Sequence, residues 1–498
     1  MVDPTSLPDH TPVVVGAAEV VHPAGDGFLM CSATELLIET AQAALAGTGA
    51  AEALGARVGE VLVPHGTWAE SDPGRAVAAA IGAETARSVR SELGVLQHSL
   101  LVRAITGVAS GRVAAAVVIG GENRWSGVVA GRSGSPLPEA PELANGEPDE
   151  LLTPEEMVIS PIEIERNLTT AAHQYAIIES ALRHRLGRTV ADHQRALGLL
   201  WERFAAVAAQ APAAWNRSAP DATAIAEPSE TNRIIAAPYT KWLVSQWNVD
   251  QAAALVVTTV GTARALSIDP SRWIFPLATA LSNLVVPMPE RAEIASWPAS
   301  RIVGAGALEL AGLSVADVDL VDLYSCFPAA VEVQAAELGL DPDGPLTLTG
   351  GMTFAGGPYN NYSLQGAAAM VGALQAAAPG TVGLTSAVSG LLTKPAVTLW
   401  SNSAPRQPYR AVDLAEEARA ATAVRIVDPD LIGLAMVVGA TVLPDREGGH
   451  TVVAVVESAA GVRSVVQSTD PHLGERFLAA DPVGVPVMID QPGRFVLG

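Results

Sequence analysis

The chain has 498 residues, of which 49% are hydrophobic and 16% charged, and at roughly 150 residues per domain this suggests about three well-buried domains. Its 52 acidic residues outnumber 30 basic ones and give a formal net charge of -22, which excludes nucleic acid and anionic lipid surfaces as electrostatic partners. The two cysteines, Cys31 and Cys326, are too few for a disulfide framework or a multi-cysteine metal centre.

No apolar run reaches the ~18 residues that a membrane span requires, and the segment MVDPTSLPDH is acidic where a signal peptide is positively charged. We therefore expect a protein without a membrane span. A cytoplasmic location fits two reduced cysteines.

The first part of the chain, residues 1–123, alternates between strand and helix patterns. A strand is predicted at 11–21, followed by a helix that stops at a glycine. Buried strands are predicted at 60–68 and 114–121, separated by an apolar helix over 97–109. This alternation is typical of an α/β fold in which helices cover a mainly parallel sheet.

Residues 124–240 have a different composition. A segment rich in proline, glycine and acidic residues is followed by helical stretches that carry aromatic and charged residues, such as HQRALGLLWERFAAVAAQ. This pattern predicts a helical loop domain inserted into the first α/β half, which resumes over 241–268.

The strand and helix order of the first half returns in residues 269–409. A buried strand at 318–325 is followed by a helix, an alanine-rich apolar helix and the strand TVGLTSAVSG, so the chain contains a duplicated α/β unit. Short alternating strands separated by turn signals then predict a small OB-like β-barrel domain over 410–498.

Three motifs of the second half resemble those of the thiolase superfamily, in particular the sterol-carrier-type thiolases. The segment VDLVDLYSCFPAAVEVQAAELGL resembles the one that carries the family's His-Asp-Cys-Phe motif. The family's Gly-His-Pro turn falls in GGMTFAGGPYNN, and its C-terminal Cys-x-Gly, or the asparagine-containing variant, falls within 387–390. The stretch 237–259 is similar to bacterial thiolase-like proteins of type 1, which carry an additional C-terminal domain.

This resemblance covers nearly the whole chain and implies the thiolase fold, in which two α/β halves stack as five αβαβα layers. It also implies a coenzyme A thioester, acyl-CoA or CoA itself, as ligand or substrate, with no further cofactor. Related folds pair through the sheet edge of the first half, whereas an added C-terminal domain can block that surface, so both a monomer and a homodimer fit.

A thiolase requires a nucleophilic cysteine at the N-terminus of the buried first-half helix, where the helix charge and backbone N–H groups lower the pKa of the thiol. This corner reads SELGVLQHSLL, and the nucleophile position falls on Gly94 or Val95. The family's activating histidine falls on Gly357, and its second proton-transfer group falls next to Val388. At the oxyanion position stands Tyr324, whose hydroxyl can still donate a hydrogen bond.

Three side chains remain as candidate catalytic groups: Tyr324, Cys326 at a strand-to-helix corner, and His98 at the start of the first-half helix. Structural roles are the competing interpretation, because relatives keep a cysteine at the place of Cys326 without using it as a nucleophile, and His98 also suits a helix cap. No metal site is expected, because the histidines at 173, 184 and 193 lack metal-binding spacing. The pocket positions implied by the motifs are Gly94, Val95, Leu96, Gln97, Ser325, Phe327, Gly356, Gly357, Pro358, Asn361, Val388, Ser389 and Gly390.

Three hypotheses for the function follow. The first is an acyl-CoA-binding protein of lipid metabolism, in the acetyl-CoA acetyltransferase family by resemblance, that has lost thiolase chemistry. The second is a retro-aldolase or lyase acting on a CoA thioester with Tyr324 as acid or base, although Cys326 stands where the partner histidine belongs. The third is a structural or interaction protein. The first hypothesis depends on the helix tip at 94–97 facing the cavity with no sulfur beside it.

Overall fold

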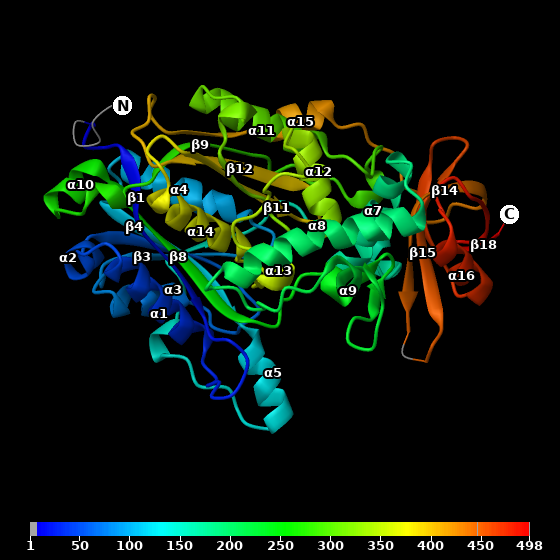
Figure 1. Cartoon of the computed structure of the whole chain (residues 1–498), viewed down its shortest axis with the longest axis horizontal. Coiled ribbons are helices and arrows are strands. Elements are labelled where there is room, and N and C mark those ends of the chain that lie inside the picture. Colours follow the sequence, from blue (N-terminus) through cyan, green and yellow to red (C-terminus); the bar gives the residue numbers. More distant parts are fainter. Residues whose placement is uncertain (1–6, 446, 498) are drawn as a thin grey trace.

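The computed structural model describes residues 7–445 and 447–497. Two mixed β-sheets form the body of the molecule (Figure 1). The first has the strand order β1-β8-β4-β2-β3-β5, in which β4, β2, β3 and β5 are parallel and β8 runs antiparallel to β1 and β4. Its strands are β1 (Pro12–Val21), β2 (Val58–Pro64), β3 (Arg87–Ser91), β4 (Ala115–Asn123), β5 (Glu150–Leu152) and β8 (Asp250–Thr259).

The second sheet has the order β10-β11-β12-β9-β13. Strand β13 lies just after the predicted domain boundary at residue 410, but it pairs with β9 inside this sheet. Short α15 (Ala415–Ala421) follows it. The strands of the sheet are β9 (Phe275–Leu281), β10 (Leu320–Asp322), β11 (Val382–Ser389), β12 (Lys394–Ser401) and β13 (Arg410–Asp413).

Alternating side chains of β4 show how the layers stack. Val117 and Ile119 pack in one cluster with helices α1 and α3, whereas Ala116 and Val118 pack with α4 and α14 between the sheets (Figure 1). Helices α11 and α12 cover the outer face of the second sheet. The predicted five-layer arrangement is therefore confirmed, as is the helix predicted over 97–109. The bounds are α1 (Ala33–Ala46), α3 (Pro73–Ala80), α4 (Gln97–Ala109), α11 (Pro298–Ala311), α12 (Pro328–Leu338) and α14 (Tyr362–Ala376).

A helical insertion lies against the second half. The indole of Trp201 on its long helix α8 donates a hydrogen bond to the Thr353 hydroxyl at 3.0 Å, and Phe204 stacks beside that indole. The helices of the insertion are α5 (Arg124–Ser133), α6 (Pro161–Glu165), α7 (Ala171–Arg185), α8 (Val190–Gln210) and α9 (Ala222–Ala226), and its hairpin is β6 (Ile234–Ala236) with β7 (Tyr239–Thr240). Shorter helices elsewhere are α2 (Ala51–Gly55), α10 (Val260–Ala265) and α13 (Gly351–Phe354).

The C-terminal strands close into a small barrel of order β14-β15-β16-β18-β17, which confirms the predicted barrel domain. Its core contains Val437, Val456 and Phe495. The first barrel strand begins at Gly433, because residues 410–421 still belong to the second half. The elements are β14 (Gly433–Pro444), β15 (His450–Ser458), β16 (Arg463–Ser468), α16 (Pro471–Ala479), β17 (Pro486–Gln491) and β18 (Arg494–Leu497).

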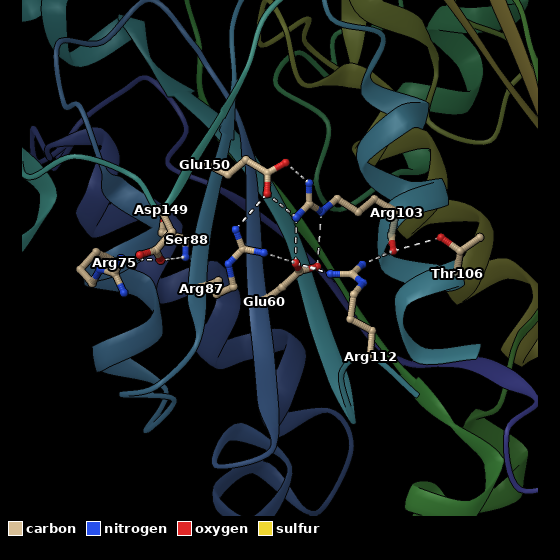
Figure 2. A network of polar contacts seen from close by, with 9 residues as sticks. All are labelled: Glu60, Arg75, Arg87, Ser88, Arg103, Thr106, Arg112, Asp149 and Glu150. Carbon is tan, nitrogen blue, oxygen red and sulfur yellow. Dashed lines mark hydrogen bonds and ion pairs between the residues drawn. The ribbon is translucent and has the colours of Figure 1, made fainter. Parts of the chain in front are cut away.

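The outer edge of the first sheet is covered by a segment of the chain itself. Strand β5 pairs with β3 in parallel, and Glu150 of β5 accepts hydrogen bonds from Arg103 at 2.6 Å and Arg87 at 3.0 Å (Figure 2). The same Arg103 also pairs with buried Glu60, at 2.9 Å. These hydrogen bonds and charges, Arg103 first, lower the pKa of Glu150 to about 2, so the network is fully charged at neutral pH. Among the residues described, no helix is both long and apolar enough to cross a bilayer.

Candidate functional site

The tip of α4 is the corner where the sequence places a thiolase nucleophile. The loop before it carries Gly94, whose φ of +95° lies in the left-handed region, and a Cβ added there would stand 3.2 Å from the ring of Pro154. The helix begins at Gln97 after Leu96, with no side-chain cap among the described residues. Its free N–H groups therefore stay available to other acceptors.

An unpredicted lysine holds this loop. Lys394, at the start of β12, donates a hydrogen bond from its ammonium group to the Gly94 carbonyl and is only 3% exposed. Burial lowers the pKa of Lys394, and the charges of Glu156 and Glu155 oppose that shift. The sequence could have indicated this residue, because lysine is rare in the chain: Lys394 is one of two lysines and lies in an apolar strand.

Two motif regions that lie far apart in the sequence meet at the α4 tip. The side-chain amide of Gln97 donates to the backbone carbonyl of Asn360 at 3.2 Å and to its side-chain oxygen. The side-chain amide of Asn360 in turn donates to the backbone carbonyl of His65 at 2.9 Å. The predicted pocket positions Gln97 and Asn361 therefore lie in one corner, because Asn361 directly follows Asn360.

This corner contains several buried polar atoms without a partner. Within the described part of the chain, neither ring nitrogen of His98 and neither side-chain polar atom of Asn361 has a hydrogen bond, nor do the Gln97 carbonyl oxygen and the Ser91 hydroxyl. Burial lowers the pKa of His98 to about 4, so its ring is neutral at neutral pH. Because unpaired buried polar groups are costly and rare, their concentration here marks a candidate site.

The Tyr324–Phe327 motif lies at the N-terminus of α12 and is buried. Burial is the main cause that raises the pKa of Cys326 to about 12, against the lowering effect of a hydrogen bond from Tyr175, so the thiol is protonated. Phe327 stacks on Tyr175 at 4.6 Å between ring centroids. Burial also raises the pKa of Tyr324, whose ring meets Tyr362 edge-on at 5.5 Å. The motif therefore holds neutral groups.

Ser325 and the Gly356–Pro358 turn are held by hydrogen bonds. The Ser325 hydroxyl accepts from the Met352 amide and bonds Tyr362, both at 3.2 Å. The Gly357 amide donates to the Gln246 carbonyl at 2.8 Å, which ties the Gly356–Pro358 turn to the segment between the insertion and β8.

The loop that follows Val388 and Ser389 is strained. Gly390, Leu391 and Leu392 have successive φ values of +60°, +62° and +70°, and the two leucines carry side chains in a region that L-residues rarely adopt. This strained loop connects the end of β11 to Lys394 and is therefore part of the same corner.

A cavity of about 630 Å³ is lined in part by Gln246, whose carbonyl accepts the hydrogen bond from the Gly357 amide, and we call it the indole cavity. Trp215, Trp242 and Trp247 line it together with the cations Arg233 and Lys241. Trp247 is 40% exposed, carries the Arg124 guanidinium 3.5 Å above its ring, and lies 6.0 Å from the ring of Tyr359. Tyr359 directly precedes Asn360, so the cavity wall is continuous with the loop that reaches the α4 tip. Sequence reasoning missed this cavity, although Trp242 and Trp247 follow Lys241 closely in the sequence.

Cys31 lies elsewhere in the first half. Its sulfur is 3.6 Å from His22 and 4.0 Å from the carboxylate of Asp250, and its backbone bonds Ser126. Burial, followed by the charge of Asp250, raises the pKa of Cys31 to about 12. In the described structure neither this sulfur nor that of Cys326 forms a hydrogen bond with residues 94–97.

The insertion also contains a buried polar cluster that the sequence did not suggest. His193 bonds Glu179 at 2.8 Å, and a carboxylate oxygen of Glu332 lies close enough for all three to share an ion. However, Arg188 donates toward the other ring nitrogen of His193 at 3.4 Å and to Glu332 at 3.1 Å. A donor at that nitrogen leaves the proton on the nitrogen facing Glu179. The cluster therefore has internal hydrogen bonds, while one carboxylate oxygen of Glu332 is buried without a partner among the described residues.

Comparisons with known proteins identify the fold. The sequence matches no family model and no curated protein. Among solved structures, a monomeric SCP2-thiolase-like protein type 1 from Mycobacterium smegmatis is 28% identical, covers 99% of this chain and 100% of its own, and has a TM-score of 0.83. Human mitochondrial 3-ketoacyl-CoA thiolase is 17% identical over 79% of this chain and 99% of its own, with a TM-score of 0.56.

The Ltp2-ChsH2(DUF35) aldolase, at 19% identity, covers 80% of this chain and 99% of its own, with a TM-score of 0.57. These structures share the predicted thiolase fold, and the first also matches the C-terminal barrel region. The chain therefore belongs to the thiolase superfamily and is similar to the SCP2-thiolase-like proteins of type 1.

Proposed function

We propose that the protein binds an acyl-CoA, or CoA itself, in the indole cavity and takes part in lipid metabolism without catalysing thiolysis. The chemistry of the cavity supports this ligand class. Indole rings offer stacking surfaces for an adenine base, and Lys241 and Arg233 offer positive charge for phosphates. The acid Glu230 also lines the cavity, so its charged side chains sum to one positive charge in a chain whose net charge is -22.

The path from the indole cavity to the α4 tip supports a thioester at the inner end. The cavity wall at Gln246 holds the Gly357 amide, and the same loop continues through Tyr359 to Asn360, which bonds Gln97. A ligand with its nucleotide at the rim therefore directs its acyl end toward the unpaired polar groups of His98 and Asn361.

One observation carries the proposed absence of thiolysis. The α4 tip offers a glycine held by Lys394, and the two cysteines are buried as neutral thiols at Tyr175 and at Asp250. Covalent transfer of an acyl group requires a thiolate or an activated thiol within reach of the thioester. The neutral groups at the tip suit binding and hydrogen bonding of a carbonyl oxygen.

Calorimetry with CoA, acetyl-CoA and acetoacetyl-CoA tests the binding, and a thiolysis assay with acetoacetyl-CoA tests the chemistry. We expect binding by the full chain, weakened by about tenfold in the double variant Lys241→Ala, Arg233→Ala, because each lost phosphate contact removes roughly 0.5–1 kcal/mol. Arg195→Ala, an exposed arginine of α8 outside the cavity, is the matched control. Ordinary thiolysis turnover contradicts the proposed loss of chemistry, and a lack of binding by CoA and by both thioesters contradicts the proposed ligand class.

A further inference from the structure

A second cavity, of about 480 Å³, lies between the insertion and the C-terminal barrel. Helices α7 and α8 and the β6–β7 hairpin form one side, and β14 and α16 of the barrel form the other. None of its lining residues is shared with the indole cavity. We call it the interdomain pocket, and its size is within the usual range for a small-molecule site.

The wall of the interdomain pocket is apolar. Its polar side chains are occupied by backbone groups: Gln194 donates to the carbonyls of Ala226 and Pro238, and Thr441 donates to that of Ala237. What remains toward the cavity is hydrocarbon and aromatic surface, which favours an apolar ligand. The principal apolar residues are Val190, Ile234, Ala440, Val442, Phe477 and Leu478.

One buried cation lines this apolar cavity. Arg183 of α7 is 5% exposed and forms an ion pair with Asp481 at 2.8 Å. Asp481 is shared, because His184 also bonds it at 2.7 Å. A guanidinium has five N–H donors. Among the described residues, the Arg183 side chain has a hydrogen bond to Asp481 alone, and its Nε is buried without a partner. The acid Glu227 also lines the pocket, but it is exposed at the rim.

From this juxtaposition we infer a second ligand site, which takes an apolar monocarboxylate such as a medium-chain fatty acid. The carboxylate accepts hydrogen bonds from the unpaired donors of Arg183, and the hydrocarbon tail packs against the apolar wall between α8 and the barrel. A charged hydrogen bond to a buried arginine is stronger than one to a neutral group, and an alkyl tail gains by leaving water. Since the two sides of the pocket belong to different domains, the bound ligand also bridges the insertion and the barrel.

Decanoate is the probe, with decanol as the neutral analogue of equal length, and binding to the full chain is measured by calorimetry. We expect decanoate to bind at least about tenfold more tightly than decanol, because an alcohol lacks the charge that Arg183 recognises. Ala479→Trp places an indole at the exposed rim on α16 and is expected to weaken decanoate binding by at least about tenfold. Glu475→Trp, on the same helix but outside the lining, is the matched control.

Arg183→Met supplies the second variant and is expected to bring decanoate down to the affinity of decanol. If that variant does not fold, Ala479→Trp still tests the site, since Arg183 is intact in it. Equal affinity of decanoate and decanol in the wild type, or unchanged decanoate binding in Ala479→Trp, overturns the inference. Competition with CoA separates the two sites: excess CoA leaves decanoate binding unchanged when the interdomain pocket is the site, and displacement by CoA assigns decanoate to the indole cavity and overturns the proposal.

Discussion

Glu332 of α12 packs against a second buried carboxyl group, and this pairing sets its protonation. Burial is the largest cause that raises the pKa of Glu332, followed by the charge of Glu179, while Arg188 acts in the opposite direction. Glu179 already accepts hydrogen bonds from His193 and from the Tyr239 hydroxyl, both at 2.8 Å. A proton on Glu332 therefore lets the two carboxyl groups share a hydrogen bond.

The raised pKa predicts how stability depends on pH. The folded state holds this proton more tightly than the unfolded chain, so its contribution is full below the unfolded pKa of about 4.3 and is lost as pH rises through the folded value. Glu332→Gln imitates the protonated form, because its amide can donate to Glu179 and its oxygen can accept from Arg188. Urea unfolding should show equal stability at about pH 4 and a variant more stable by about 1–2 kcal/mol at about pH 9.

The exposed carboxyl of Glu309 on α11 provides the control, and Glu309→Gln is expected to leave the pH profile of the wild type unchanged. A Glu332→Gln profile parallel to the wild type across this range would contradict the shared proton.

At the scale of elements, the α4 tip resists the reintroduction of a nucleophile. Gly94→Cys forces a side chain into left-handed backbone and against Pro154, whereas Val95, the neighbouring position, is free of positive φ. We expect Gly94→Cys to lower the free energy of unfolding by about 1–2 kcal/mol relative to Val95→Cys, and neither variant to gain thiolysis. Urea unfolding and the acetoacetyl-CoA assay measure both outcomes. Comparable stabilities of the two variants would contradict the predicted strain at Gly94. Thiolysis by either variant would show that the α4 tip can accommodate a working nucleophile.

The elements with strong local periodicity were predictable, because the spacing of apolar residues within one short segment shows which face is buried. The helix over 97–109 and the duplicated strands are of this kind. Strand β5 was not predicted, since three residues within an acidic loop are too few to show a hydrophobic periodicity. Its position depends on hydrogen bonds from Arg87 and Arg103. Likewise, β13 was placed with the barrel because its partner β9 precedes it by more than a hundred residues.

The candidate site divides in the same way. The family resemblance implied Gln97 and Asn361 as pocket positions, and in the structure Gln97 bonds Asn360, the residue before Asn361. The contact between Lys394 and Gly94 joins residues that are 300 positions apart, so only the folded chain reveals it. The indole cavity depends on Trp215 and Trp247 meeting across an irregular segment, and the sequence contains no periodicity that predicts such a meeting.

For the whole molecule, the barrel is fixed to both other parts of the chain. Buried Arg463 of β16 donates to the backbone carbonyls of Arg291 and Ala292 in the second half, and the Gln467 side chain donates to the carbonyl of Arg166 in the insertion. These bonds hold the barrel in one orientation, and the interdomain pocket lies at its contact with α7 and α8. The edge of the first sheet that β5 covers contributes no residue to this pocket.

The pairing of β5 with β3 at the edge of the first sheet predicts the oligomeric state. An unpaired edge strand offers backbone donors and acceptors to a second copy, and β5 occupies those of β3. Glu150→Arg replaces the carboxylate that pairs with Arg87 and Arg103 by a cation, which should release β5 and expose β3 (Figure 2). Analytical ultracentrifugation should show a monomeric wild type and self-association of the variant. Glu147→Arg makes the same charge change outside this network and should remain monomeric. A dimeric wild type, or a monomeric Glu150→Arg with exchange-protected β3 amides, would mean that β5 does not control assembly.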